Sequence, residues 1–203
     1  MYDVGIAEPA YTRLQNDQRR ELLLATATEL FAKQSYDEIS MAQIARHAGI
    51  SKALLYHYFP SKREFFAAAI ASAGEELRER TAYDPDAPPA VALAGSLDAF
   101  LEWIEENPDA YANLMRSANS PEIRDMIEGV RAETVGRVLD GLFPDDTAPP
   151  KVRTAVTAWL WFMDGACLDW VANRDLERPD IHGLLLRTLM GALASAGFEF
   201  PAG

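Results

Sequence analysis

The amino-acid sequence predicts an all-α protein in which a small N-terminal helix-turn-helix domain precedes a larger helical domain. Every long segment repeats its apolar residues with helical period, and no segment shows the alternation of a strand. The 203 residues suffice for one large domain or two small ones. Residues 83–89 contain three prolines and form the clearest break in the chain. We expect about nine helices, divided between domains at residues 1–64 and 65–203.

The first expected helix begins near Asn16 or Asp17, which are both suitable N-caps, and it ends near Gln34. Pro60 and the serine after it end the preceding helix, and a longer helix follows over residues 62–81. This fourth helix belongs to both halves of the molecule, because it starts in the N-terminal domain and ends at the break.

Two short helices, at residues 42–48 and 51–59, match a helix-turn-helix. Ser40 and Ser51 are their N-cap candidates. Gly49 can adopt the positive φ that the tight turn requires, because it lacks a Cβ atom.

The larger domain shows five further helical segments. The apolar residues of each recur with helical spacing, and each segment has its own stop or start signal. The first covers residues 93–104 and stops before Pro108, and a short helix follows around 111–115. The third is capped by Ser120 and has Pro121 in its first turn. The last two are the apolar helix 152–171 and a helix that is capped by Asp180 and stops at Gly197.

The net charge of −12 argues at first against nucleic acid, because phosphate binding is driven by Lys and Arg. The charge is unevenly distributed, however. Residues 1–70 contain eight basic and eight acidic residues, whereas the rest contains 11 basic and 23 acidic residues. No acidic residue lies between Ile39 and Arg63. This asymmetry is typical of a segment that faces nucleic acid and is attached to an acidic body.

The second helix of the helix-turn-helix is the candidate for the DNA major groove. Such a helix reads base edges with residues near its N-terminus, and flanking groups hold phosphates. The candidate DNA-binding residues are Ser40, Gln43, Ser51, Lys52, Ala53, Leu54, Tyr56, His57, Tyr58 and Lys62. The alternative, that these helices only form a small bundle, has the same periodicity.

The run ISMAQIARHAGISKALLYHYFPSK at residues 39–62 resembles the TetR family of bacterial transcriptional regulators. The resemblance covers about residues 17–66. Two positions depart from the family pattern, since Ser35 and Ala53 stand where glycine is frequent. The resemblance implies a homodimeric regulator, most often a repressor, that binds a pseudo-palindromic double-stranded DNA operator. It also implies a cavity for a small-molecule effector between the fifth to eighth helices, and a dimer formed by the last two.

Large apolar side chains gather in the C-terminal domain and supply the candidates for lining such a cavity, although an aromatic stripe more often belongs to a plain core. They are Phe100, Trp103, Tyr111, Leu114, Met115, Met126, Trp159 and Met163. Asp164 stands among them and has three interpretations. Its carboxylate binds a cationic ligand, pairs with an arginine such as Arg187, or lies in solvent, since a buried charge requires a partner.

The helix over 152–171 is apolar on more than one face, and small residues in it and in the last helix allow close helix crossing. We therefore expect a two-fold dimer through these two helices, in a four-helix arrangement. The alternative is that both helices only cover the monomer.

Other function classes find little support in the sequence. It contains no glycine-rich phosphate loop, and one cysteine and three histidines supply no metal-ligand set, so neither catalytic residues, metal nor cofactor is expected. Cys167 is interpreted as a small packing residue. No signal peptide or membrane span is visible, which favours a cytoplasmic protein. The alternatives are a helical ligand-binding or protein-interaction dimer that has lost operator binding, and an activator of the same fold.

Overall fold

The structure of the protein is a computed structural model that describes residues 10–82, 87–144 and 147–199. These residues form nine α-helices and one short 3-10 turn and contain no strand, which confirms the all-α prediction. The helices are α1 (Ala10–Phe31), α2 (Met41–His47), α3 (Lys52–Tyr58), α4 (Lys62–Arg80), α5 (Pro89–Glu106), α6 (Pro108–Arg116), α7 (Pro121–Leu142), α8 (Pro150–Asn173) and α9 (Arg178–Ser195), with the 3-10 turn η1 (Ser117–Asn119) between α6 and α7.

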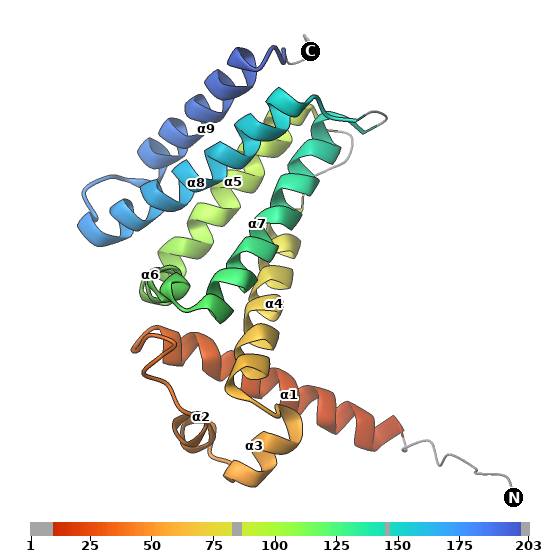
Figure 1. Ribbon diagram of the computed structural model, residues 1–203, viewed down its shortest axis with the longest axis vertical. Coiled ribbons are helices and arrows are strands. Elements are labelled where there is room, and N and C mark those ends of the chain that lie inside the picture. The colour runs from red at the N-terminus through yellow and green to blue at the C-terminus, as the bar shows by residue number, and fades with distance from the viewer. Residues whose placement is uncertain (1–9, 83–86, 145–146, 200–203) are drawn as a thin grey trace, which may run out of the picture.

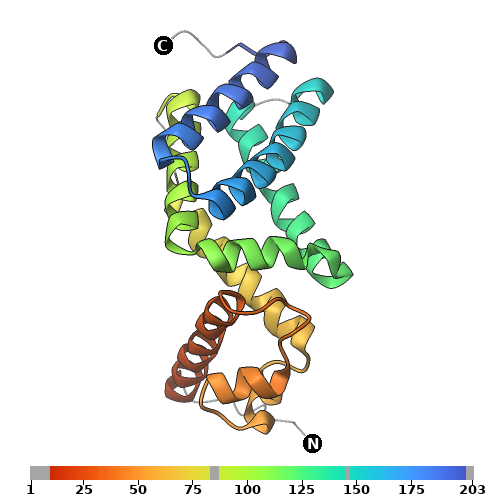
Figure 2. The same ribbon diagram turned by 90° about the vertical axis from the view of Figure 1, so that its left-hand side faces the viewer.

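The molecule is elongated, with the helices α1 to α3 at one end and α5 to α9 at the other (Figure 1). Helix α4 leaves the group α1–α3 and runs into the group α5–α9, so it belongs to both. Helix α7 runs in the same general direction beside it, and α8 and α9 lie along one side of the larger group (Figures 1 and 2). We refer to α1–α3 with the start of α4 as the N-terminal domain, and to the rest as the body.

Local hydrogen bonds explain where the helix-turn-helix begins and turns. The Ser40 hydroxyl accepts the Gln43 backbone N–H, and the Gln43 side chain accepts the Ser40 backbone N–H, which is a complete capping box. The Ser51 hydroxyl accepts the Leu54 backbone N–H in the same way at the start of α3. Gly49 has a φ of 67° in the turn between the two helices. The N-caps and the glycine turn predicted from sequence are therefore confirmed.

Two predicted helix starts are wrong. Helix α1 begins at Ala10 rather than near Asn16, because the residues between them include no glycine or proline to stop it. Helix α9 has Glu177 as its N-cap residue, and Asp180 lies within the first turn instead. The proline after Arg178 accounts for this earlier start, since its fixed φ suits the first turn of a helix.

Two buried serines lie at the turn between α6 and α7. Ser120 is the N-cap residue of α7 with proline in the first turn, as predicted, but its hydroxyl donates to the Glu122 carboxylate at 2.6 Å rather than accepting a backbone N–H. The Ser117 hydroxyl donates to the Asn113 carbonyl and accepts the Tyr36 backbone N–H at 3.0 Å. This second serine therefore joins the body to the loop that follows α1.

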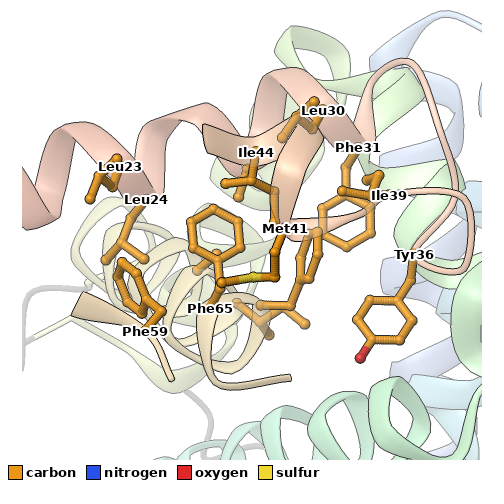
Figure 3. Packing of buried hydrophobic residues seen from close by; sticks show 14 of the residues in the cluster. Leu23, Leu24, Leu30, Phe31, Tyr36, Ile39, Met41, Ile44, Phe59 and Phe65 are labelled. Atoms are coloured by element: carbon orange, nitrogen blue, oxygen red, sulfur yellow. The ribbon is translucent and has the colours of Figure 1, made fainter. Parts of the chain in front are cut away.

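An aromatic cluster joins α1, α3 and α4 in the N-terminal domain (Figure 3). Phe65 packs edge-on against Phe59 at the end of α3 and against Phe66, with ring centroids 5.1 and 5.2 Å apart. Phe66 in turn contacts Phe31 and Tyr36 at 4.6 and 5.1 Å. All five rings are buried, so the end of α3 is fixed to the start of α4.

Each end of the molecule has its own hydrophobic core. The core of the N-terminal domain also takes in Ala110 of α6 and Ile127 of α7, whereas the second core is built from α5 to α9. In the second core, the Trp159 indole N–H donates to the Leu185 carbonyl at 2.9 Å and ties α8 to α9. The predicted domain boundary at residue 64 falls inside α4 and remains a prediction.

The aromatic cluster predicts the effect of truncating Phe65, which is fully buried. We expect Phe65→Ala to lower the free energy of unfolding by about 3–5 kcal/mol, because it removes a buried ring and leaves a cavity. Urea denaturation at fixed protein concentration measures this. Leu22→Ala is the control, because Leu22 is 70% exposed on α1 and its truncation should change stability by less than about 0.5 kcal/mol. If Phe65→Ala and Leu22→Ala lowered the free energy of unfolding equally, the Phe65 ring would not have this stabilising role.

Candidate functional site

Helix α3 presents one exposed face. Lys52, Ala53, Tyr56 and His57 are exposed and lie at helical spacings of one and four residues, while Leu55 is fully buried on the opposite side. The exposed face begins at the N-cap of α3. The sequence-predicted residues for base contact are thus at the surface, at the N-terminal end of this helix.

The polar groups of this face are arranged around aromatic rings. The Lys52 ammonium lies 5.8 Å from the centre of the Tyr56 ring, and the His57 and Tyr58 rings meet edge-on at 5.5 Å. Leu54 and Tyr58 are half-buried. The face therefore offers one ammonium, one imidazole and phenol hydroxyls, which are groups that donate to phosphate and base acceptors.

Three other predicted contact residues already have partners inside the protein. Ser40 and Gln43 bond each other in the capping box, and the Gln43 amide also donates to Gln34. The Lys62 ammonium donates to the carbonyls of Tyr36 and Ile39 at 3.0 and 3.1 Å. These bonds hold the loop before α2 against α4, and they leave one of the three ammonium hydrogens for another acceptor.

His47 ends α2 and lies at the surface. Its Nε2 atom lies 2.7 Å from a carboxylate oxygen of Glu29 on α1. In the part of the chain that the structure describes, no group of three or more His, Cys, Asp or Glu residues could hold a metal ion. His47 therefore makes a surface contact between α2 and α1.

The body contains a cavity of about 490 Å³, which lies within the range of sites for small organic molecules. Seven of the eight sequence-predicted lining residues lie in its wall, and they are Phe100, Trp103, Tyr111, Leu114, Met115, Trp159 and Met163. Met126 does not, because it packs against the core of the N-terminal domain. The next residue on α7, Ile127, faces the cavity instead.

The wall also includes residues of α1 and α4 that the sequence analysis did not single out. Ala27, Thr28 and Phe31 of α1 reach the cavity, and so does one whole face of α4. The residues of that face are Ala69, Ile70, Ala73, Gly74, Leu77, Arg78 and Thr81. Their spacing is helical and was visible in the sequence, but a helix that lines a cavity and a helix that packs in a core have the same period.

Asp164 is paired within the cavity wall. Its carboxylate lies 2.6 Å from the Arg131 guanidinium, and the side chains are only 14% and 17% exposed. The partner is thus Arg131 of α7 rather than Arg187. The Tyr111 hydroxyl donates to the other carboxylate oxygen at 3.4 Å. Burial raises the pKa of the Asp164 carboxyl, which the Arg131 charge opposes, and burial holds the pKa of Tyr111 well above its usual value.

Helices α8 and α9 expose large apolar side chains. Trp161 and Phe162 of α8 are 56% and 42% exposed, and Leu184 of α9 is 41% exposed. The Arg131 guanidinium lies 4.1 Å from the centre of the Trp161 ring, which links this surface to the ion pair of the cavity wall. Large exposed apolar side chains of this kind are candidates for contact with another protein.

Comparison with family models assigns both parts of the chain. Residues 23–69 match the model described as "Bacterial regulatory proteins, tetR family". Residues 89–192 match the model described as "Tetracyclin repressor-like, C-terminal domain". The first match contains α2 and α3, and the second contains most of the helices that surround the cavity. In the described residues, no helix has the length and hydrophobicity needed to cross a membrane.

Individual relatives agree with this assignment. The chain is 34% identical over 101 residues to the HTH-type transcriptional activator FasR of Mycolicibacterium smegmatis, a match that spans 49% of this chain and 46% of that relative. It is 26% identical over 173 residues to the HTH-type transcriptional repressor KstR of Rhodococcus jostii, over 79% and 80% of the two chains. A tetR-family transcriptional regulator of Streptomyces coelicolor superimposes with a TM-score of 0.75 at 28% identity, over 89% and 82% of the two chains.

The ion pair in the cavity wall predicts a non-additive pair of substitutions. Asp164→Leu should lower the free energy of unfolding by about 3 kcal/mol, because it leaves Arg131 buried without its partner. Arg131→Leu combined with Asp164→Leu should lose less than the single variant, since the pair is then replaced by apolar side chains. Chemical denaturation of the wild type, of each single variant, Asp164→Leu and Arg131→Leu, and of the double variant measures the coupling. Purely additive losses would show that the pair does not act as a unit.

Proposed function

Because the chain belongs to the TetR family of bacterial regulatory proteins, we propose that it is a homodimeric transcriptional repressor that releases its DNA operator when a small molecule occupies the cavity. The observation that carries this proposal is that α4 takes part in both sites. Its first turns pack against the end of α3, and the face that follows lines the cavity. We assign operator binding to residues 1–64, and effector binding and dimerisation to residues 65–203.

In this proposal α3 lies in the major groove of a double-stranded, pseudo-palindromic operator. Ser51, Lys52 and Ala53 approach base edges, because they stand at the N-terminal end of the exposed face. The other predicted residues flank them and face the phosphates or the groove wall. They are Ser40, Gln43, Leu54, Tyr56, His57, Tyr58 and Lys62.

The effector acts by favouring one of two arrangements of the N-terminal domain. A molecule in the cavity touches α1 at Phe31 and α4 at Ala69, which both belong to the core of that domain. A second connection runs through α6, because Asn113 donates to the Phe31 carbonyl at 2.6 Å. Occupancy therefore shifts the population of domain orientations, by no more than the effector's difference in affinity for the two states.

We propose that the dimer forms through α8 and α9, with an unidentified small-molecule effector in each body. The exposed Trp161, Phe162 and Leu184 support this, since apolar side chains on two adjacent helices are what a four-helix interface buries. A two-fold axis through these helices would leave both copies of α3 free to reach DNA. We place the protein in the cytoplasm, where it would meet its operator.

A second candidate is an activator of the same fold. It is favoured by the relative from Mycolicibacterium smegmatis, which is named an activator and is 34% identical over 101 residues. Both candidates use the same DNA-binding face and the same cavity. They differ in what the bound protein does to transcription of the neighbouring gene.

Operator binding predicts a steep dependence on salt. The protein should retard the DNA upstream of its own gene in a gel, and its affinity should fall as salt rises because bound phosphates release counterions. Lys52→Ala should weaken binding, and loss of a phosphate contact there would reduce the slope of log affinity against log salt by about 1. Lys151→Ala is the control, because Lys151 is exposed on α8, away from α3. No retardation at low salt would contradict operator binding.

The dimer predicts a mass of about twice the 22.5 kDa of one chain at micromolar concentration. Leu184→Glu should give a monomer, because it places a charge in the centre of the proposed interface. Val91→Glu should remain dimeric, because Val91 is 61% exposed on α5 and lies outside that surface. Sedimentation equilibrium distinguishes the two. A monomeric wild type, or dissociation by Val91→Glu alone, would argue against the interface on α8 and α9.

A further inference from the structure

The cavity is long, and its two ends differ. The lining face of α4 extends from Ala69 to Thr81, which is about 18 Å at 1.5 Å per residue. Ala69 and Ile127 stand at the end next to the N-terminal domain, where they belong to its hydrophobic core together with Phe31. This end of the cavity is formed by apolar side chains.

The half of the cavity away from the N-terminal domain carries positive charge. Arg78 lies nine residues beyond Ala69 on α4, and Arg137 lies ten residues beyond Ile127 on α7, which correspond to about 14 and 15 Å along helices that run in the same general direction (Figure 1). The charge of Glu133 on α7 also acts on the Arg78 guanidinium, which agrees with α4 and α7 being adjacent near these two residues. The two arginines therefore lie in the half of the cavity that is remote from the N-terminal domain, and the wall continues beyond Arg137 to Leu142 on α7.

The charges of the wall do not cancel. Its charged residues are Arg78, Arg131, Arg137 and Asp164. Arg131 is neutralised by Asp164, and Arg78 is bound to Glu75 on the same helix. Arg137 is exposed and forms no ion pair with any residue that the structure describes.

This charge stands out because the rest of the body is acidic. Residues 71–203 contain 23 acidic and 11 basic residues, yet the described residues of the cavity wall include three arginines and one acid. A wholly apolar ligand would need no cation at one end of its site. A cationic ligand would be repelled there, and Asp164, the one carboxylate among the described residues of the wall, already has a partner.

We propose that the effector is an elongated amphipathic anion. Its apolar chain extends towards Phe31, and its anionic group lies beside Arg137, with Arg78 on the rim. This inference rests on the proposed function, because it takes the cavity to be the effector site. It adds the chemical class of the effector and its direction, so that the apolar end of the molecule reaches the helices that hold α3.

Three probes with the same chain and different head groups test the inference, namely dodecanoate, dodecan-1-ol and dodecylammonium at micromolar concentration. Trp103 and Trp159 line the cavity, so tryptophan fluorescence reports binding to the full-length protein. We expect dodecanoate to bind about tenfold more tightly than dodecylammonium, with the alcohol between them, because one surface charge attracts the first and repels the second. Equal or reversed affinities, or no binding by any probe, would overturn the inference.

Charge-reversal variants locate the head group. Arg137→Glu should reduce the preference for dodecanoate over dodecylammonium by about tenfold and leave the affinity for the alcohol within about twofold. Arg153→Glu is the matched control, because Arg153 is also an exposed arginine of the body but does not line the cavity, and the preference should persist. An unchanged preference in Arg137→Glu would overturn the assignment of Arg137.

The same probes separate this inference from the proposed function. If dodecan-1-ol or dodecylammonium releases operator DNA and dodecanoate does not, the protein is an effector-controlled regulator but its effector is not an anion. If dodecanoate binds with the expected preference while no operator fragment is retarded, the ligand class is supported and the regulatory function is contradicted.

Discussion

The packing of Phe59 against Phe65 is the contact on which the arrangement of the protein depends. Phe59 ends α3, and Phe65 begins the buried face of α4, so these two rings fix the exposed helix to α4, which extends from the N-terminal domain into the body. Phe66 adds Phe31 and Tyr36 to the same cluster. Because buried rings are closely packed and yield little, a displacement of α4 is transmitted to α3.

The other part of α4 connects this cluster to the cavity. The part of α4 before Ala69 packs in the core of the N-terminal domain. From Ala69 onward, one face of the same helix lines the cavity. The cavity also borders the second core, because Trp159 and Met163 of that core lie in its wall, and the Trp159 hydrogen bond ties α8 to α9 there. The cavity therefore lies between the helices that hold α3 and the helices of the proposed dimer surface.

Local features were predictable from sequence, and long-range ones were not. Ser40, Ser51 and Gly49 act on atoms within three residues or on their own backbone, so the pattern of the sequence determines them. The partner of Asp164 was uncertain because Arg131 lies 33 residues away on another helix. The inward direction of the Lys62 ammonium likewise depends on carbonyls more than 20 residues earlier. The contribution of α1 and α4 to the cavity was not recognised, since core and cavity walls share one periodicity.

Regulation by a dimer requires that two copies of α3 reach DNA together, so the sequences that the protein selects from a random pool of duplexes should share a two-fold symmetric consensus. Its half-sites should be centred about one helical turn, about 34 Å, or slightly more apart. Recovery of a single unrepeated half-site, or of no consensus at all, would contradict regulation by such a dimer.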